Sequence, residues 1–170
     1  MAKIAMIGAG SMVFCKTLVM DILATESLQD SEFCLMSRTW PKLERMKNFV
    51  ERIIRENHVP ARVSATLDRR MALDGAKYVI IMIQAGGLEA FGIDYKIPMK
   101  YGVDQCIADT LGPGGIFRAL RTIPVLVEIS RDMEQLCPDA TILNYANPMA
   151  ACCLALGRTS RTPFIGLCHG

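Results

Sequence analysis

The sequence has no apolar run long enough to span a bilayer, and it has almost no excess of charge of either sign. Nineteen Lys and Arg residues stand against seventeen Asp and Glu, which leaves a formal net charge of +2. Such a balance does not indicate nucleic acid or a membrane surface as a partner. The amino terminus is typical of a strand and a glycine turn, not of a secretory signal. We therefore expect a cytoplasmic protein that binds neither nucleic acid nor membrane.

Cysteine pairs with zinc-knuckle spacing are also missing, although the chain contains seven cysteines. Their odd number, and their position mostly within apolar runs, argue against a disulfide framework. We expect most of them to be small buried hydrophobic residues. The length of 170 residues and the hydrophobic fraction of 51% predict one folded domain over residues 1–170.

The first residues of the chain carry the pattern of a mononucleotide-binding unit. An apolar run at 3–7 predicts a strand, Gly8-Ala9-Gly10-Ser11 follows at once, and a helical pattern begins just beyond. Gly8 suits a tight turn, and Gly10 would let the backbone approach a pyrophosphate at the start of the next helix. The third glycine of the G-x-G-x-x-G motif is replaced by Val13. On the motif alone, an ordinary strand–helix turn stays an open alternative.

Strands alternate with helices along the rest of the chain. This order predicts an α/β fold, namely a Rossmann-type, doubly wound parallel sheet in three layers. The expected strands are 3–7, 32–36, 62–65, 77–83, 141–145 and 164–167, and the expected main helices are 14–24, 42–57, 116–137 and 148–156. Between 88 and 107 we expect a loop, a short helix over 94–101 and an extended segment. We expect Gly112–Gly115 to form a rigid corner and Pro124 to bend the helix after it or to separate two helices.

In such sheets the ligand lies beyond the carboxyl ends of the strands. Small and polar residues follow several of the expected strands. The residues predicted to bind a dinucleotide are Gly8, Gly10, Ser11, Ser37, Arg38, Gln84 and Gly86.

Longer motifs indicate a family. Beside Ile7–Ser11, the chain has the segments Ala108–Pro124, Asn144–Ala150 and Gly166–His169, in this order. With these segments the chain resembles glycoside hydrolase family 4, most closely its α-galactosidase (melibiase-type) branch, and also its α-glucosidases. The resemblance covers essentially the whole chain, but it corresponds only to the amino-terminal, NAD-binding half of the family.

The resemblance implies a glycosidase that uses NAD and a divalent metal, typically Mn²⁺, and that departs from the usual two-carboxylate scheme. In the family, the C3 hydroxyl of the sugar is oxidised, the C2 proton is removed, and elimination breaks the O-glycosyl bond. The metal polarises the sugar oxygens. The resemblance also implies a small glycoside as substrate and a homo-oligomer for the full-length family.

The resemblance assigns roles to residues near the strand ends. Cys168 matches a metal-binding cysteine, whereas a buried thiol is the alternative. His169 and Asn147 match residues that contact the sugar, although His169 could face solvent and Asn147 could cap a helix. Asp109 and Arg118 lie near the expected substrate site, where Asp109 could instead form a turn and Arg118 could be a surface charge.

Two departures from the family pattern limit these expectations. The segment Ser37-Arg38-Thr39 has no carboxylate to bind the ribose 2′-hydroxyl of NAD, and family members commonly have Asp where Ser37 stands, so NADP stays an alternative cofactor. The carboxyl-terminal half, which should supply the general base, is missing, so the catalytic residue is unknown and we expect no turnover by this chain alone. The alternatives are a 2-hydroxy-acid dehydrogenase of lactate/malate type and a nucleotide-binding module without catalysis.

Overall fold

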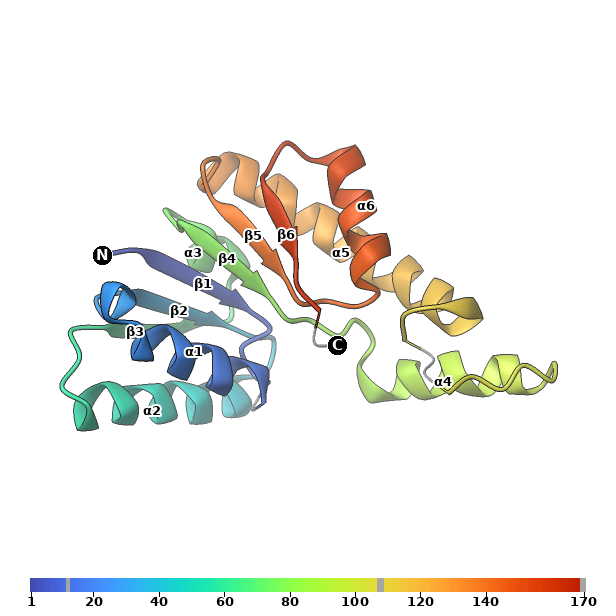
Figure 1. The fold of residues 1–170 in the computed structure, drawn as a ribbon, viewed down its shortest axis with the longest axis horizontal. Helices are drawn as coiled ribbons and strands as arrows, with labels where there is room; N and C mark the ends of the chain where they lie inside the picture. Colours follow the sequence, from blue (N-terminus) through green and yellow to red (C-terminus); the bar gives the residue numbers. More distant parts are fainter. Residues whose placement is uncertain (12, 107–108, 169–170) are drawn as a thin grey trace.

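The centre of the protein is a parallel sheet of six strands. The computed structural model describes residues 1–11, 13–106 and 109–168 (Figure 1). The strands lie in the order β3-β2-β1-β4-β5-β6, and all neighbouring pairs are parallel. Their bounds are β1 Lys3–Ile7, β2 Glu32–Met36, β3 Arg62–Thr66, β4 Tyr78–Ile81, β5 Thr141–Asn144 and β6 Phe164–Gly166. This order confirms the predicted Rossmann-type, doubly wound sheet, and it reverses between β1 and β4.

The central strands are buried on both faces because helices cover both sides of the sheet. Ala5 of β1 pairs with Cys34 of β2 on one side and with Val79 of β4 on the other, and all three are buried. Continuous apolar runs are typical of parallel strands in this position. The same runs made β1 and β2 predictable to the residue.

Helices form the two outer layers. The helices are α1 Phe14–Ala24, α2 Trp40–Glu56, α3 Arg69–Leu73, α4 Gly87–Met99, α5 Gly112–Leu136 and α6 Met149–Thr159, with a 3₁₀ turn η1 at Glu26–Leu28. One buried cluster joins α1 and α2 to the sheet, and a second joins α3, α5 and α6 to its other face. Neither cluster contains a residue of α4, which projects away from the sheet in Figure 1.

Two parts of the predicted helix pattern were wrong. α4 begins at Gly87, where a loop was expected, and it continues to Met99 as one helix. The glycine-rich segment from Gly112 is not a corner before α5 but its first turn. Of the two alternatives predicted for Pro124, a junction between two helices is excluded because α5 runs through it, and a bend of the helix stays a prediction. The short helix α3 was not predicted at all.

The start of α5 shows why its first turn is rich in glycine. Gly112 has a φ of +64°, which favours glycine. A Cβ atom on Gly115 would lie 2.7 Å from the carbonyl carbon of Thr110, so only glycine fits there. The side chain of Gln105 accepts a hydrogen bond from the N–H of Gly114 at 3.2 Å and donates one to the carbonyl of Leu111. Gln105 thus satisfies a backbone group that the helix start would leave unpaired.

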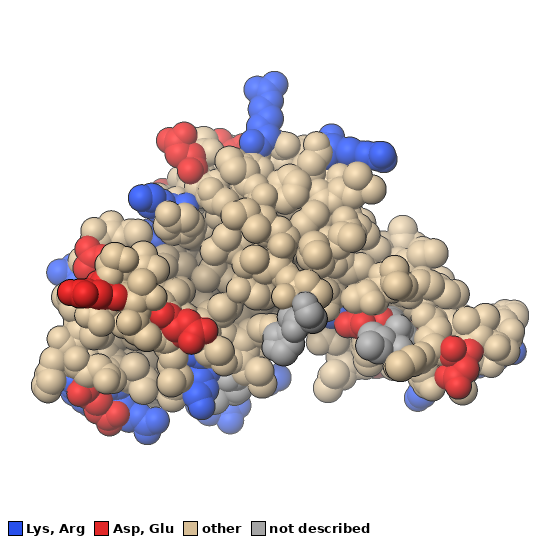
Figure 2. All heavy atoms as spheres, viewed as in Figure 1, with Lys and Arg blue, Asp and Glu red and all other residues tan. Residues whose placement is uncertain are grey.

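The surface in the view of Figure 2 carries charges of both signs, and its middle is largely uncharged. This agrees with the small net charge of +2. None of the helices in the described ranges is both long enough and apolar enough to cross a membrane.

The cysteines should differ sharply in reactivity. Burial raises the pKa of Cys15 to about 12 and that of Cys152 to about 11, so both thiols stay protonated at pH 8 and react slowly. Cys106 and Cys168 are exposed. Titration of the folded protein with Ellman's reagent at pH 8 should therefore show two fast thiols, with the others released by denaturant. A fast phase of undiminished amplitude in the double variant C106S/C168S would contradict this prediction.

Candidate functional site

The turn after β1 needs glycine at its first position. Gly8 has a φ of +95°, and a Cβ atom there would lie 2.6 Å from the carbonyl oxygen of Met82. The N–H groups of Gly8 and Ala9 both donate to the carbonyl of Met36 at 2.9 Å. The turn is therefore pressed between the residues that follow β2 and β4, at the carboxyl edge of the sheet.

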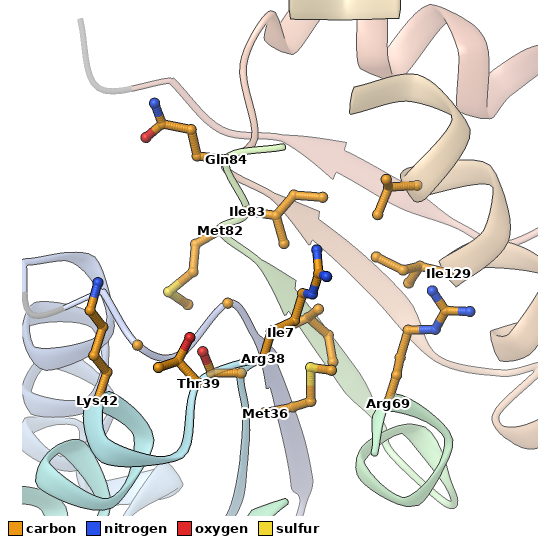
Figure 3. A pocket seen from close by; sticks show the side chains of 14 residues that line it. Ile7, Met36, Arg38, Thr39, Lys42, Arg69, Met82, Ile83, Gln84 and Ile129 are labelled. Atoms are coloured by element: carbon orange, nitrogen blue, oxygen red, sulfur yellow. The ribbon is translucent and has the colours of Figure 1, made fainter. Parts of the chain in front are cut away.

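A cavity of about 320 Å³ opens beside this turn. In Figure 3 its side chains come from the ends of β1, β2 and β4 and from α2, α3 and α5. The lining residues are Ile7, Gly8, Gly10, Met36, Ser37, Arg38, Thr39, Lys42, Arg69, Met82, Ile83, Gln84, Val125 and Ile129. Apolar walls with a few polar groups are typical of a small-molecule site.

Every charged side chain that lines the cavity is a cation. Arg69 forms an ion pair with Asp132, because its Nε and Nη2 atoms lie 2.7 and 2.5 Å from Oδ2 of Asp132. Arg38 and Lys42 are exposed, and within the described ranges their side chains have neither a hydrogen bond nor an ion pair. The lining of the cavity therefore carries uncompensated positive charge.

Polar side chains also meet beyond β5. Nη1 of Arg118 lies 3.0 Å from Oδ2 of Asp109, and the amide of Asn147 donates to the same oxygen at 3.4 Å. Arg118 also lies over the ring of Phe91, with 5.8 Å between its Cζ atom and the ring centroid. Asp109 Oδ1 and Arg118 Nε are buried, and no partner for either is found among the described residues. Both atoms therefore have unused hydrogen-bonding capacity.

A buried ion pair lies beside this group and joins α4 to α5. Asp94 is 1% exposed, and Arg121 donates to both of its carboxylate oxygens, with 2.7 Å between Nη1 and Oδ1. These hydrogen bonds raise the pKa of Arg121 above its usual value. Gly86 lies close by, since a Cβ atom on it would be 3.2 Å from Nε of Arg121.

The structure brings most of the predicted cofactor residues together. Gly8, Gly10, Ser37, Arg38 and Gln84 all line the cavity. Their binding role stays a prediction, because the structure holds no dinucleotide.

Two other predicted residues lie outside the lining. The Oγ atom of Ser11 accepts a hydrogen bond of 3.4 Å from the N–H of Phe14, where α1 begins. Gly86 precedes α4 with a φ of +81°. Sequence reasoning also missed Arg69, which comes from the unpredicted α3, and the pairing of Asp94 in α4 with Arg121 in α5, which is a contact between two helices that no local pattern shows.

The predicted metal ligand Cys168 is exposed and follows β6. No group of three or more His, Cys, Asp or Glu side chains that could hold a metal ion is found within residues 1–11, 13–106 and 109–168. These residues do not form a metal centre by themselves, and the role of Cys168 stays a prediction. The predicted sugar contact at His169 lies outside the described residues.

The fold is that of a Rossmann-type α/β protein, and comparison with known proteins gives the family. The sequence model described as "Family 4 glycosyl hydrolase" matches residues 3–170. The chain is 47% identical over 169 residues to an α-galactosidase of Rhizobium meliloti (strain 1021) and 46% identical over 170 residues to one of Bacillus subtilis (strain 168). It therefore belongs to glycosyl hydrolase family 4, which sets aside the lactate/malate-type dehydrogenase.

Solved structures agree with this assignment. One is the 6-phospho-β-glucosidase of Thermotoga maritima with manganese, NAD⁺ and glucose-6-phosphate, at a TM-score of 0.88 and 29% identity. The chain is covered to 99% in all three comparisons. It spans only 34% and 39% of the length of the two α-galactosidases, and 40% of the glucosidase chain.

Proposed function

We propose that this chain forms the dinucleotide-binding part of a family 4 glycosidase that hydrolyses α-galactosides with NAD or a closely related dinucleotide and a divalent metal. The similarity to two α-galactosidases, at 47% and 46% identity, supports the substrate class. The glucosidase structure with manganese and NAD⁺ supports the cofactors. The reaction would follow the family scheme, in which the sugar is oxidised at C3 before elimination.

The observation that carries the proposal is the bare backbone of the glycine turn at the cavity. Gly8 and Gly10 both line it, and a Cβ atom on Gly10 would lie 3.0 Å from Oγ of Ser37. A side chain at either position would fill space that a pyrophosphate needs. Bound there, the dinucleotide supplies the hydride acceptor for the sugar. The apolar residues Met82, Ile83 and Val125 would pack against its nucleoside and exclude water.

The polar group beyond β5 is the proposed sugar side of the site. Asp109 and Arg118 have buried polar atoms without a partner in the described part of the chain, and Asn147 donates to the oxygen of Asp109 that Arg118 contacts. A carboxylate and a guanidinium in this arrangement can accept from and donate to sugar hydroxyl groups. Cys168 is proposed as one ligand of the metal. No step is assigned to the metal, because the described residues do not complete its site.

Calorimetric titration of NAD and NADP into the purified 170-residue chain tests the dinucleotide part of the proposal. One dinucleotide should bind per chain, and at a hundred times the Kd it should raise the free energy of unfolding by about 2.7 kcal/mol. Gly10→Ala should weaken binding, because its Cβ would occupy the approach to the pyrophosphate, while the melting curve stays near that of the unmodified chain. Absence of binding by both dinucleotides would refute this part.

The glycosidase part needs a separate assay. We propose that residues 1–170 alone do not hydrolyse an α-galactoside, since the α-galactosidases they resemble are two to three times as long. Turnover of a chromogenic α-galactoside with dinucleotide and Mn²⁺ should therefore be absent from this chain. Measurable turnover that requires the dinucleotide would contradict the proposed inactivity and support the assigned activity. Binding without turnover also fits a non-catalytic nucleotide-binding module.

A further inference from the structure

The end of β2 is the part of a Rossmann-type site that distinguishes NAD from NADP. An acidic side chain there bonds the 2′-hydroxyl of the adenosine ribose, whereas a nearby arginine accommodates a 2′-phosphate. Here β2 ends at Met36, and the next residues are Ser37, Arg38 and Thr39. The cavity lining contains no carboxylate. The group that would select NAD is thus replaced by two hydroxyl groups and a guanidinium.

The charged side chains that line the cavity favour the binding of an anion. Arg69 is neutralised by Asp132, with Nη2 and Oδ2 2.5 Å apart. Arg38 and Lys42 have no such counter-charge among the described residues, and Lys42 rises along one side of the cavity in Figure 3. Two uncompensated cations beside one cavity attract a phosphate, and a guanidinium can bind it with two parallel hydrogen bonds.

The start of α2 adds to this positive potential. α2 has seventeen residues, and Thr39 precedes it without a side-chain cap, so no side chain caps the N–H groups of Trp40 and Lys42 in its first turn, where Pro41 has none. The amino end of a helix carries a partial positive charge, and Lys42 lies in this first turn. A lysine at such a position is slightly unfavourable, and a bound anion would offset this cost. The first turn and the two cations therefore fit the same ligand.

We propose that Ser37, Arg38, Thr39 and Lys42 bind the 2′-phosphate of an NADP-type dinucleotide, and that the chain prefers NADP to NAD. This inference rests on the proposed dinucleotide site, whose glycine turn lines the same cavity. Ser37 is placed to take part, because its Oγ would be 3.0 Å from a Cβ on Gly10 and thus lies at the glycine turn. The preference concerns only the adenosine end and leaves the hydride chemistry unchanged.

Parallel calorimetric titrations with NADP and NAD test the preference. NADP should bind roughly ten to a hundred times more tightly, which is the usual effect of one or two hydrogen bonds to a charged group. Equal affinity, or tighter binding of NAD, would overturn this inference and leave the dinucleotide site intact. Absence of binding by both would refute the site itself and the inference with it.

Substitutions separate the phosphate contacts from the rest of the site. Arg38→Ala and Lys42→Ala should each reduce NADP affinity about tenfold and change NAD affinity by less than about twofold. Arg55→Ala is the matched control, because Arg55 is an exposed cation in the last turn of α2 and does not line the cavity. Ser37→Asp should reverse the preference toward NAD. An equal loss of both dinucleotides in the Arg38 and Lys42 variants would contradict the assignment.

Discussion

Replacing Gly8 by alanine is expected to lower the free energy of unfolding by roughly 2 to 4 kcal/mol. Two effects add at this position. A φ of +95° is unfavourable for any residue with a Cβ. The new methyl group would also lie 2.6 Å from the carbonyl oxygen of Met82, which is backbone and cannot rotate away. The turn or the chain after β4 must then shift, as urea denaturation should show.

Gly75→Ala is the control that separates the two effects. Gly75 also has a positive φ, +65°, but nothing lies within 4 Å of the position its Cβ would take. Its replacement should cost only about 1 to 2 kcal/mol, the cost of the left-handed conformation alone. If both variants lost the same stability, the close approach of Met82 to the turn would be contradicted.

The second large effect is expected at the ion pair between α4 and α5. Asp94→Ala should lower the free energy of unfolding by roughly 2 to 4 kcal/mol. The loss is smaller than for a fully buried pair, because the Arg121 side chain is 32% exposed and water can hydrate its guanidinium once Asp94 is gone. Since α4 contributes to neither buried cluster, the loss should appear mainly as local opening of α4. Hydrogen exchange should show faster amides in α4 and unchanged amides in β4.

Glu89→Ala provides the matched control on the same helix. Glu89 is an exposed acid in the first turn of α4, so its removal changes the charge equally and should cost only about 0.5 kcal/mol. Unchanged protection of α4 in the Asp94 variant would show that this ion pair does not hold the helix.

Much of the fold could be predicted because its elements carry regular local signals. β1, β2 and α1 were predicted to the residue, since each carries a clear apolar pattern. The pocket residues Gly8, Ser37 and Gln84 were found by a topological rule, that ligands lie beyond the carboxyl ends of parallel strands. Such a rule needs only the positions of the strand ends.

The errors have a physical cause in tertiary contacts. α4 has no sustained apolar stripe and contains Pro98, so its pattern indicated only a short helix over 94–101 and not the first turns from Gly87. The ion pair of Asp94 with Arg121 joins the helix to α5. The first turn of α5 is rich in glycine because the backbone of Thr110 passes close to Gly115. α3 is only five residues long, which is too short for any period to be visible.

Because α5 is continuous through Pro124, a single helix fixes the distance between the cavity and the polar group beyond β5. One end of this helix presents Arg118 to the polar group beyond β5, and a later turn presents Ile129 to the cavity beside the glycine turn. At about 1.5 Å per residue, the two positions are roughly 16 Å apart along one rod. The spacing between the cavity and the polar group beyond β5 is therefore set by a single helix rather than by loops. A one-residue insertion between them would turn one region by about 100° relative to the other.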